Sequence, residues 1–169
     1  TRYLRAQHCD LFFADAAILG EVPAEKMLGP NFIRAHYPYL TQCYLTLLEI
    51  NGSHAHRLRE LIEALGLLTL VITDIDAAEV QVMKNKAGKD VERNIAAPPK
   101  RGSGQLTNNA SLKGWAPGIG DIDGLLAAGP DDKERIGDQL FAVRVAYQLP
   151  VTIPGASQGK TEEVLPSTF

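Results

Sequence analysis

The most constraining feature of the sequence is an alternation of short apolar runs and amphipathic stretches between residues 16 and 76. The apolar runs have the length of buried strands and occupy residues 16–20, 43–50 and 67–73. Apolar side chains recur at helical spacing in residues 24–37 and 58–65, so we expect a helix after each of the first two runs. This order predicts right-handed crossovers, and therefore an α/β fold with a mostly parallel sheet and helices on both faces.

Three residues mark the expected ends and breaks of these helices. Pro30 lies inside the first helical stretch, where we expect it to kink the helix or split it in two. Ser53 follows the turn residues Asn51 and Gly52 and suits the N-cap of the second helix. Gly66 follows the last apolar position of that helix and suits its C-terminal end.

The second half of the chain is less regular. Residues 84–109 are polar and rich in Lys, Gly, Pro and Asn, which predicts a long loop with room for a short hairpin over residues 82–91. The remaining expectations are one or two short helices in residues 110–128, a helix over 133–139, a final strand over 140–147 and a loop over 154–163. We therefore expect a single domain over residues 1–169, with its core in residues 11–80 and 110–150, cut from a larger protein.

Composition narrows the class of protein. The net charge is −3 and the pI is near 5.8, which argues against a chain whose whole surface binds nucleic acid. It does not exclude a nuclease, because bound divalent cations reverse the local sign of a carboxylate cluster. No apolar run approaches the roughly 20 residues that span a bilayer, so no membrane association is expected. Cys9 and Cys43 form no disulfide framework and are expected to be reduced, buried thiols of a cytoplasmic protein.

Acidic residues follow two of the three predicted strands. Glu21 ends the first strand, and Asp74 and Asp76 end the third. In an open parallel sheet, ligands bind beyond the carboxyl ends of the strands. Glu25 lies one helical turn after Glu21, and Asp74 and Asp76 would share a face if their segment is extended. Oxygen ligands of this kind suit Mg²⁺, although solvated loop ends and helix-terminal charges remain the alternative for each acid.

The order of these pieces resembles the TOPRIM domain, a Rossmann-like fold of topoisomerases, primases and nucleases of the OLD (overcoming lysogenization defect) family. That family carries a Glu after its first strand and an Asp-x-Asp after its third, as Glu21 and Asp74-Ile75-Asp76 do here. Further segments similar to OLD-family nucleases are Phe12-Phe13-Ala14-Asp15, Pro23-Ala24-Glu25-Lys26, Gly52-Ser53-His54-Ala55-His56, Leu70-Val71-Ile72-Thr73-Asp74 and Leu112-Lys113-Gly114-Trp115. The resemblance is good over residues 11–76 and thinner to residue 169.

The resemblance implies a DNA endonuclease that uses Mg²⁺ or Mn²⁺, as a pair of ions. Glu21, Glu25, Asp74 and Asp76 would then be the metal ligands, and Glu21, Asp74 and Asp76 the catalytic residues. In topoisomerase relatives, the residue that matches Glu21 is assigned to general acid–base catalysis instead. Full-length OLD proteins also place an ABC-type ATPase before this domain and a further helical segment with a catalytic Lys after it. A homodimer is a possible assembly.

Two departures from the family pattern concern turns. The family usually has Gly directly after the first-strand Glu, whereas Val22 and Pro23 follow Glu21 here. Val before Pro favours an extended backbone, so the turn must be built differently or the site is impaired. The second departure is Asn51 in place of a Gly, which is milder because Asn tolerates left-handed geometry.

Other signals carry less weight. A basic stretch suited either to a DNA backbone or to a solvated loop comprises Lys84, Lys86, Lys89, Arg93, Lys100 and Arg101. His54 and His56 lack the spacing of a zinc site and are interpreted as polar residues at a helix start, with a contact to phosphate as the alternative. Trp115 is interpreted as a core anchor. Residues 155–161 resemble a P-loop, but one residue is missing between its glycines, so no nucleotide site is expected.

The sequence is therefore compatible with three functions. The first is a metal-dependent DNA endonuclease. The second is a non-catalytic TOPRIM-like module that binds nucleic acid, assembles with partners or regulates an attached ATPase. The third, a response-regulator-like phosphoacceptor, is weak because the paired acids after the first strand that such a site needs are absent.

Overall fold

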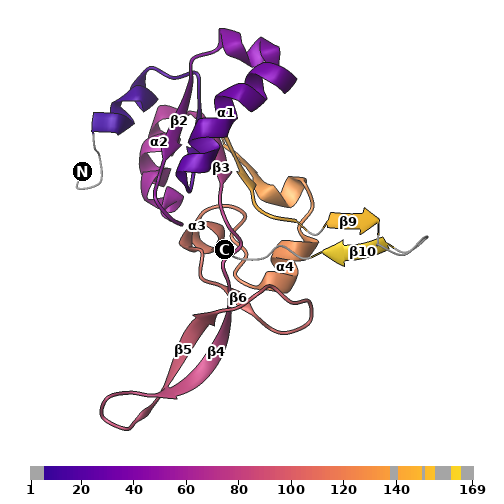
Figure 1. Ribbon diagram of the computed structural model, residues 1–169. Helices are drawn as coiled ribbons and strands as arrows, with labels where there is room; N and C mark the ends of the chain where they lie inside the picture. Colours follow the sequence, from indigo (N-terminus) through magenta and orange to yellow (C-terminus); the bar gives the residue numbers. More distant parts are fainter. Residues whose placement is uncertain (1–5, 138–140, 150, 155–160, 165–169) are drawn as a thin grey trace.

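The computed structural model describes residues 6–137, 141–149, 151–154 and 161–164 (Figure 1). Its first half contains β1 (Ala16–Gly20), α1 (Pro23–His36), β2 (Leu45–Glu49), α2 (Arg59–Leu65) and β3 (Leu68–Ile72). Its second half contains β4 (Ala77–Lys84), β5 (Asp90–Ala96), β6 (Leu106–Thr107), α3 (Ala110–Gly114), α4 (Ile122–Ala127), β7 (Glu134–Ile136), β8 (Ala142–Ala146), β9 (Val151–Pro154) and β10 (Thr161–Val164). Short 3-10 helices cover η1 (Ala6–Phe12), η2 (Pro38–Gln42), η3 (Ala55–Leu58) and η4 (Asp131–Lys133).

The central sheet has five strands in the order β2-β1-β3-β8-β7. The first four strands are parallel, and β7 joins the edge of β8 in the antiparallel direction. The parallel strands are short and almost entirely apolar, as strands covered on both faces are. The predicted α/β fold with a mostly parallel, TOPRIM-like sheet is confirmed.

The two faces of this sheet are covered unequally. Ala17 and Leu19 of β1 point into the main core, which also includes Ile62 of α2 and Leu125 of α4. On the opposite face Ile18 is only half-buried and lies beneath α1. No residue of α1 is buried, so this helix covers its face of the sheet loosely. Helices therefore lie on both faces, as the sequence predicted, but only one face forms a closed core.

Several local expectations need correction. Pro30 does not split the first helix, because α1 runs unbroken through it on an exposed surface where the lost backbone bond is tolerated. Ser53 is not an N-cap, since the segment after β2 opens with η3, whose cap position is His54. Gly66 does end α2 in a left-handed conformation, with φ of 63°.

The long loop expected over residues 84–109 is wrong where β5 and β6 form, whereas residues 97–105 between these strands contain no helix or strand. β4 and β5 form an antiparallel hairpin that includes residues 82–91, where the sequence left room for one, and extends well beyond them. β6 adds a short third strand beside the start of β4. Figure 1 shows this hairpin projecting away from the five-stranded sheet.

The C-terminal part also differs from expectation. The helix predicted over residues 133–139 is wrong, since Glu134–Ile136 is strand β7, paired with β8. The strand predicted over residues 140–147 is β8, but it is not the last one, because β9 and β10 form an antiparallel pair after it. Residues 155–160 of the P-loop-like segment lie outside the described residues.

The expectations for the short helices and for Trp115 are confirmed, whereas the one for the cysteines is wrong. The short helices α3 and α4 form as predicted, and Trp115 between them is 1% exposed, as a core anchor should be. Cys9 and Cys43 are free but exposed, so the expectation of buried thiols is wrong. Among the described residues, none of the helices has the length and apolar content needed to cross a bilayer.

Candidate functional site

The acidic residues lie where strand order reverses in the central sheet. The chain passes from β1 outward to β2 and then returns to the other side of β1 as β3. Open α/β sheets bind ligands in the crevice beyond such a switch point, at the carboxyl ends of the two strands. Glu21 directly follows β1, and Asp74 follows β3 by one residue. Strand topology therefore brings these two acids to the same edge.

Glu21 is the most buried acid of the group, with 8% of its surface exposed. Gly20 lies opposite Ile72 in the register of β1 and β3, so the next residues, Glu21 and Thr73, face each other. Oε2 of Glu21 accepts hydrogen bonds from the Thr73 hydroxyl and from the backbone N–H of Asp74, the latter at 2.9 Å. The carboxylate is thus held in one orientation at the switch point.

Asn109 fixes the segment that carries Thr73 and Asp74, and it was not identified from the sequence. Its side-chain amide donates to Oγ1 of Thr73 at 2.6 Å and to the carbonyl oxygen of Asp74 at 2.7 Å. Its side-chain oxygen accepts from the backbone N–H groups of Ser111 and Leu112, which caps α3. Asn109 is fully buried, and its side chain joins the start of α3 to the segment that carries Asp74. The only sequence signal was an Asn at a predicted helix start.

Gln148 is a second residue that the sequence did not reveal. Ala146 of β8 lies opposite Ile72 of β3, so continuing both strands places Gln148 beside Asp74. The amide of Gln148 donates to Oδ1 of Asp74, and its side-chain oxygen accepts from the backbone N–H of Ile75 at 2.9 Å. One glutamine therefore fixes both the side chain of Asp74 and the backbone after it.

Asp76 adopts an unusual backbone conformation. Its φ is 47°, so the segment is not extended, and the expectation that Asp74 and Asp76 share a face for that reason is wrong. Aspartate tolerates this left-handed region better than most residues, and a bond from the Asn108 N–H to the Asp76 carbonyl, 2.8 Å long, holds it there. Strained residues of this kind concentrate at functional sites.

The three acids Glu21, Asp74 and Asp76 interact electrostatically. Burial, together with the negative charges of Glu21 and Asp74, raises the pKa of Asp76 to about 6. Each added proton or cation would relieve this repulsion. The structure therefore brings together three of the four acids predicted from the sequence.

Glu25, the fourth acid, is engaged by its own helix. Its Oε2 accepts the backbone N–H of Val22 at 3.1 Å, which caps the start of α1. Val22 is extended, with φ of −125°, and Pro23 occupies the first turn of the helix. The turn after Glu21 is therefore built without positive φ, which is the different construction expected from Val22 and Pro23. At the other departure, Asn51 takes φ of 51°, as expected of an Asn that replaces Gly.

The donor set fits a hard divalent cation in part. The described residues contain no group of three or more His, Cys, Asp or Glu side chains placed to enclose a metal ion. Mg²⁺ does not require one, because it is commonly held by one or two carboxylates, with water and substrate phosphate completing its shell. Carboxylates that repel one another at a half-buried edge are suited to that role.

His54 and His56 lie at the start of η3, as interpreted from the sequence. The backbone N–H of His56 donates to Oγ of Ser111 at 3.2 Å, and its Nδ1 lies 3.4 Å from the same oxygen. Burial lowers the pKa of His56, so its ring is neutral near pH 7. Ser111 also donates to the Ser53 carbonyl, so these bonds join the loop after β2 to α3.

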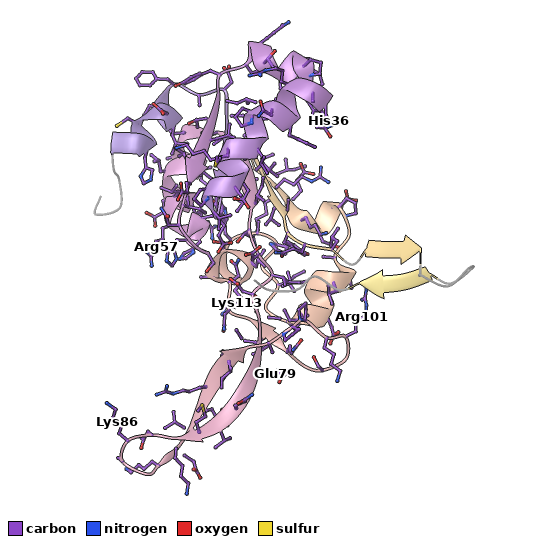
Figure 2. All side chains as sticks on the ribbon, viewed as in Figure 1. His36, Arg57, Glu79, Lys86, Arg101 and Lys113 are labelled. Carbon is purple, nitrogen blue, oxygen red and sulfur yellow. The ribbon has the colours of Figure 1, made fainter. Side chains whose placement is uncertain are left out.

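The six basic residues predicted to contact DNA lie on different elements of the structure. Lys84 ends β4, and Lys86 and Lys89 lie in the turn that follows. Arg93 lies on β5, and Lys100 and Arg101 lie in the segment between β5 and β6. Figure 2 shows Lys86 at the far end of the hairpin and Glu79 near its base. The six residues therefore do not form one patch.

An apolar pocket of about 370 Å³ lies elsewhere, between α1 and the sheet. Its lining includes Ile18, Phe32, Leu47 and Leu70, and Glu25 is the one acid on its wall. Glu21, Asp74 and Asp76 do not line it. The pocket is therefore separate from the carboxylate cluster.

Comparison with known proteins agrees with this geometry. Residues 12–76, from the end of η1 to Asp76, match the family model described as Overcoming lysogenization defect protein-like, TOPRIM domain. Searches of curated proteins and of solved structures found no match. TOPRIM domains bind divalent metals and are typical of metal-dependent nucleases and primases. The matched segment contains all four acids predicted from the sequence.

Proposed function

We propose that this chain, whose residues 12–76 are an OLD-like TOPRIM domain, hydrolyses the phosphodiester bonds of DNA in a reaction that depends on Mg²⁺ or Mn²⁺. The observation that carries the proposal is the position of Glu21, with its carboxylate fixed by Thr73 and Asp74 at the switch point of the sheet. Asp76 completes the cluster, since the charges of Glu21 and Asp74 both act on its carboxylate.

In this proposal Glu21, Asp74 and Asp76 hold the metal, one ion or two, and Glu25 would contribute through the carboxylate oxygen that does not accept the Val22 N–H. A divalent cation at such a site supplies charge stabilisation for the leaving oxygen and lowers the pKa of a nucleophilic water. The substrate phosphate would enter beyond the carboxyl ends of β1 and β3.

The other residues of the site act by positioning. Thr73 and the Asp74 N–H orient the Glu21 carboxylate, and Gln148 orients that of Asp74. Asn109 fixes Thr73 and the Asp74 backbone together. Bonds of this kind hold ligands near their working geometry before the metal arrives, which commonly affects metal affinity by 10- to 100-fold.

The test combines metal binding with cleavage. Mn²⁺ is titrated calorimetrically into the intact chain and into a Glu21→Gln/Asp74→Asn variant, and both are incubated with supercoiled plasmid in Mn²⁺ or EDTA. We expect binding and cleavage by the intact chain only. A matched control, Glu60→Gln/Asp131→Asn, removes two exposed acids elsewhere and should behave like the intact chain. Equal Mn²⁺ affinity in all three proteins would contradict the assignment.

A second candidate is a non-catalytic TOPRIM-like module that binds DNA or regulates an attached ABC-type ATPase. The observation in its favour is that the described acids do not form a complete three-ligand group. It predicts DNA binding without cleavage in the same plasmid assay, even when Mn²⁺ is bound.

A further inference from the structure

The β4–β5 hairpin, residues 77–96, is here called the arm. It stands clear of the five-stranded sheet (Figure 1). β4 has eight residues, and at about 3.3 Å per residue the arm reaches roughly 25 Å from its base. Val80 and Val82 on one face and Met83 on the other remain exposed, so the described chain covers neither face. An isolated two-stranded hairpin is only marginally stable in water, so we expect this one to contact a partner outside the chain.

The base of the arm is fixed to the candidate site. Asp76 directly precedes β4, and its carbonyl accepts the Asn108 N–H at 2.8 Å. β6 pairs with Ala77 and Ala78, and the Thr107 hydroxyl donates to the Ile75 carbonyl at 2.7 Å. The arm therefore has a defined direction relative to the carboxylate cluster.

The tip of the arm is an ordered turn. Oδ1 of Asn85 accepts the backbone N–H groups of Ala87 and Lys89, at 2.9 and 3.0 Å. The backbone of Asn85 also donates to the Lys89 carbonyl at 2.8 Å, and Gly88 takes φ of 75° to close the turn. These bonds fix the backbone that carries three lysines within six residues.

These lysines are Lys84, Lys86 and Lys89, and all are exposed. Within the part of the chain that the structure describes, none of them forms an ion pair, even though Asp90 lies opposite Lys84 in the register. Lysines that only prevent strand association lie along the strand edges. Here they concentrate at the tip, which creates a small positive end on a negatively charged chain.

We propose that the arm holds duplex DNA by its phosphates, with Lys84, Lys86 and Lys89 as the contacts. This inference rests on the proposed function in taking DNA as the substrate. A two-stranded β-ribbon fits the major groove, and exposed lysines at its end would meet the flanking phosphates. At about 3.4 Å per base step, a reach of roughly 25 Å places these contacts within about seven base pairs of the phosphate at the carboxylate cluster.

The test measures binding of a fluorescently labelled 30-base-pair duplex by anisotropy in EDTA, over a series of salt concentrations. In Lys84→Ala/Lys86→Ala/Lys89→Ala we expect at least about tenfold weaker binding and a salt slope smaller by about 2 to 3, because each lost phosphate contact removes about 0.9. The charge control Arg34→Ala/Arg135→Ala/Arg144→Ala removes three exposed cations from α1, β7 and β8 and should bind like the intact chain. The opposite change on the arm, Asp90→Asn/Glu92→Gln, should tighten binding.

If the triple variant keeps the affinity and salt slope of the intact chain on the labelled duplex, or loses no more than the arginine control, the arm proposal is wrong, and the arm would instead serve a protein partner. Loss of DNA affinity in the triple variant together with unchanged Mn²⁺ titration would support the arm whether or not hydrolysis is observed.

Discussion

The hydroxyl of Thr73 donates a hydrogen bond to the carboxylate of Glu21 across 52 residues of sequence. The same hydroxyl accepts the side-chain amide of Asn109, so it transmits the position of α3 to the acid at the end of β1. Both partners are buried, and neither can replace this bond with water. Thr73 is therefore a positioning residue on which the carboxylate cluster depends.

Thr73→Val tests this dependence, because it keeps the shape of the side chain and removes its hydroxyl. We expect the free energy of unfolding to fall by about 1–3 kcal/mol, since buried groups of Glu21 and Asn109 lose a partner. Denaturant unfolding followed by the fluorescence of Trp115, the sole tryptophan, measures the change. Thr73→Ser retains the hydroxyl and should keep most of the stability. Equal stability of the Val and Ser variants would show that the bond is unimportant.

Asp76 makes the metal-free protein sensitive to pH. Its pKa is raised to about 6 when folded, against about 3.9 when unfolded, so the folded state binds the proton more tightly. The stability contributed by this group is therefore highest below pH 4, declines as the pH rises toward 6 and stays low above it. In EDTA at pH 7.5, Asp76→Asn should be more stable than the intact chain by on the order of 1 kcal/mol, because water still screens a half-buried charge.

The Asp76→Asn advantage should shrink toward zero near pH 4, and thermal unfolding across this pH series measures it. Asn also tolerates the left-handed backbone at position 76, so the substitution does not add strain. Mn²⁺ should stabilise the intact chain and leave the variant nearly unchanged. A variant less stable than the intact chain at pH 7.5 without metal would contradict the electrostatic account.

Glu25 can be tested for two roles separately. Glu25→Gln keeps an oxygen that accepts the Val22 N–H but removes the charge, whereas Glu25→Ala removes both. If Glu25 only caps α1, the Gln variant should keep both stability and Mn²⁺ affinity, and the Ala variant should lose about 1 kcal/mol. Calorimetric titration and thermal unfolding of both variants give the answer. A clear loss of Mn²⁺ affinity in Glu25→Gln would make Glu25 a metal ligand.

Much of the site was predictable because it depends on strand order. Short apolar runs identified β1 and β3, and the rule that ligands bind at strand ends then selected Glu21 and Asp74. The left-handed Asn51 followed from its residue type. These inferences needed only local sequence and the handedness of parallel crossovers.

The parts that escaped prediction depend on tertiary contacts. Asn109 and Gln148 lie 35 and 74 residues from Asp74, and no local pattern links them to it. The positive φ of Asp76 depends on Asn108, a distant partner. The arm was predicted only as a short hairpin over residues 82–91 beside a long loop, because both of its faces are exposed and the chain after Met83 is mostly polar.

A substitution at Gln148 can test whether a bound metal offsets the repulsion of an added carboxylate. Gln148→Glu keeps an acceptor for the Ile75 N–H but replaces the donor to Asp74 with another carboxylate. Without metal, this added repulsion and lost bond should lower stability by about 1–3 kcal/mol. Mn²⁺ should then stabilise this variant more than the intact chain, because the cation offsets a larger repulsion. The uncharged Gln148→Met loses both hydrogen bonds and should show no such enhanced metal response. Thermal unfolding with and without Mn²⁺ separates these cases, and identical metal responses in the Glu and Met variants would place Gln148 outside the metal's surroundings.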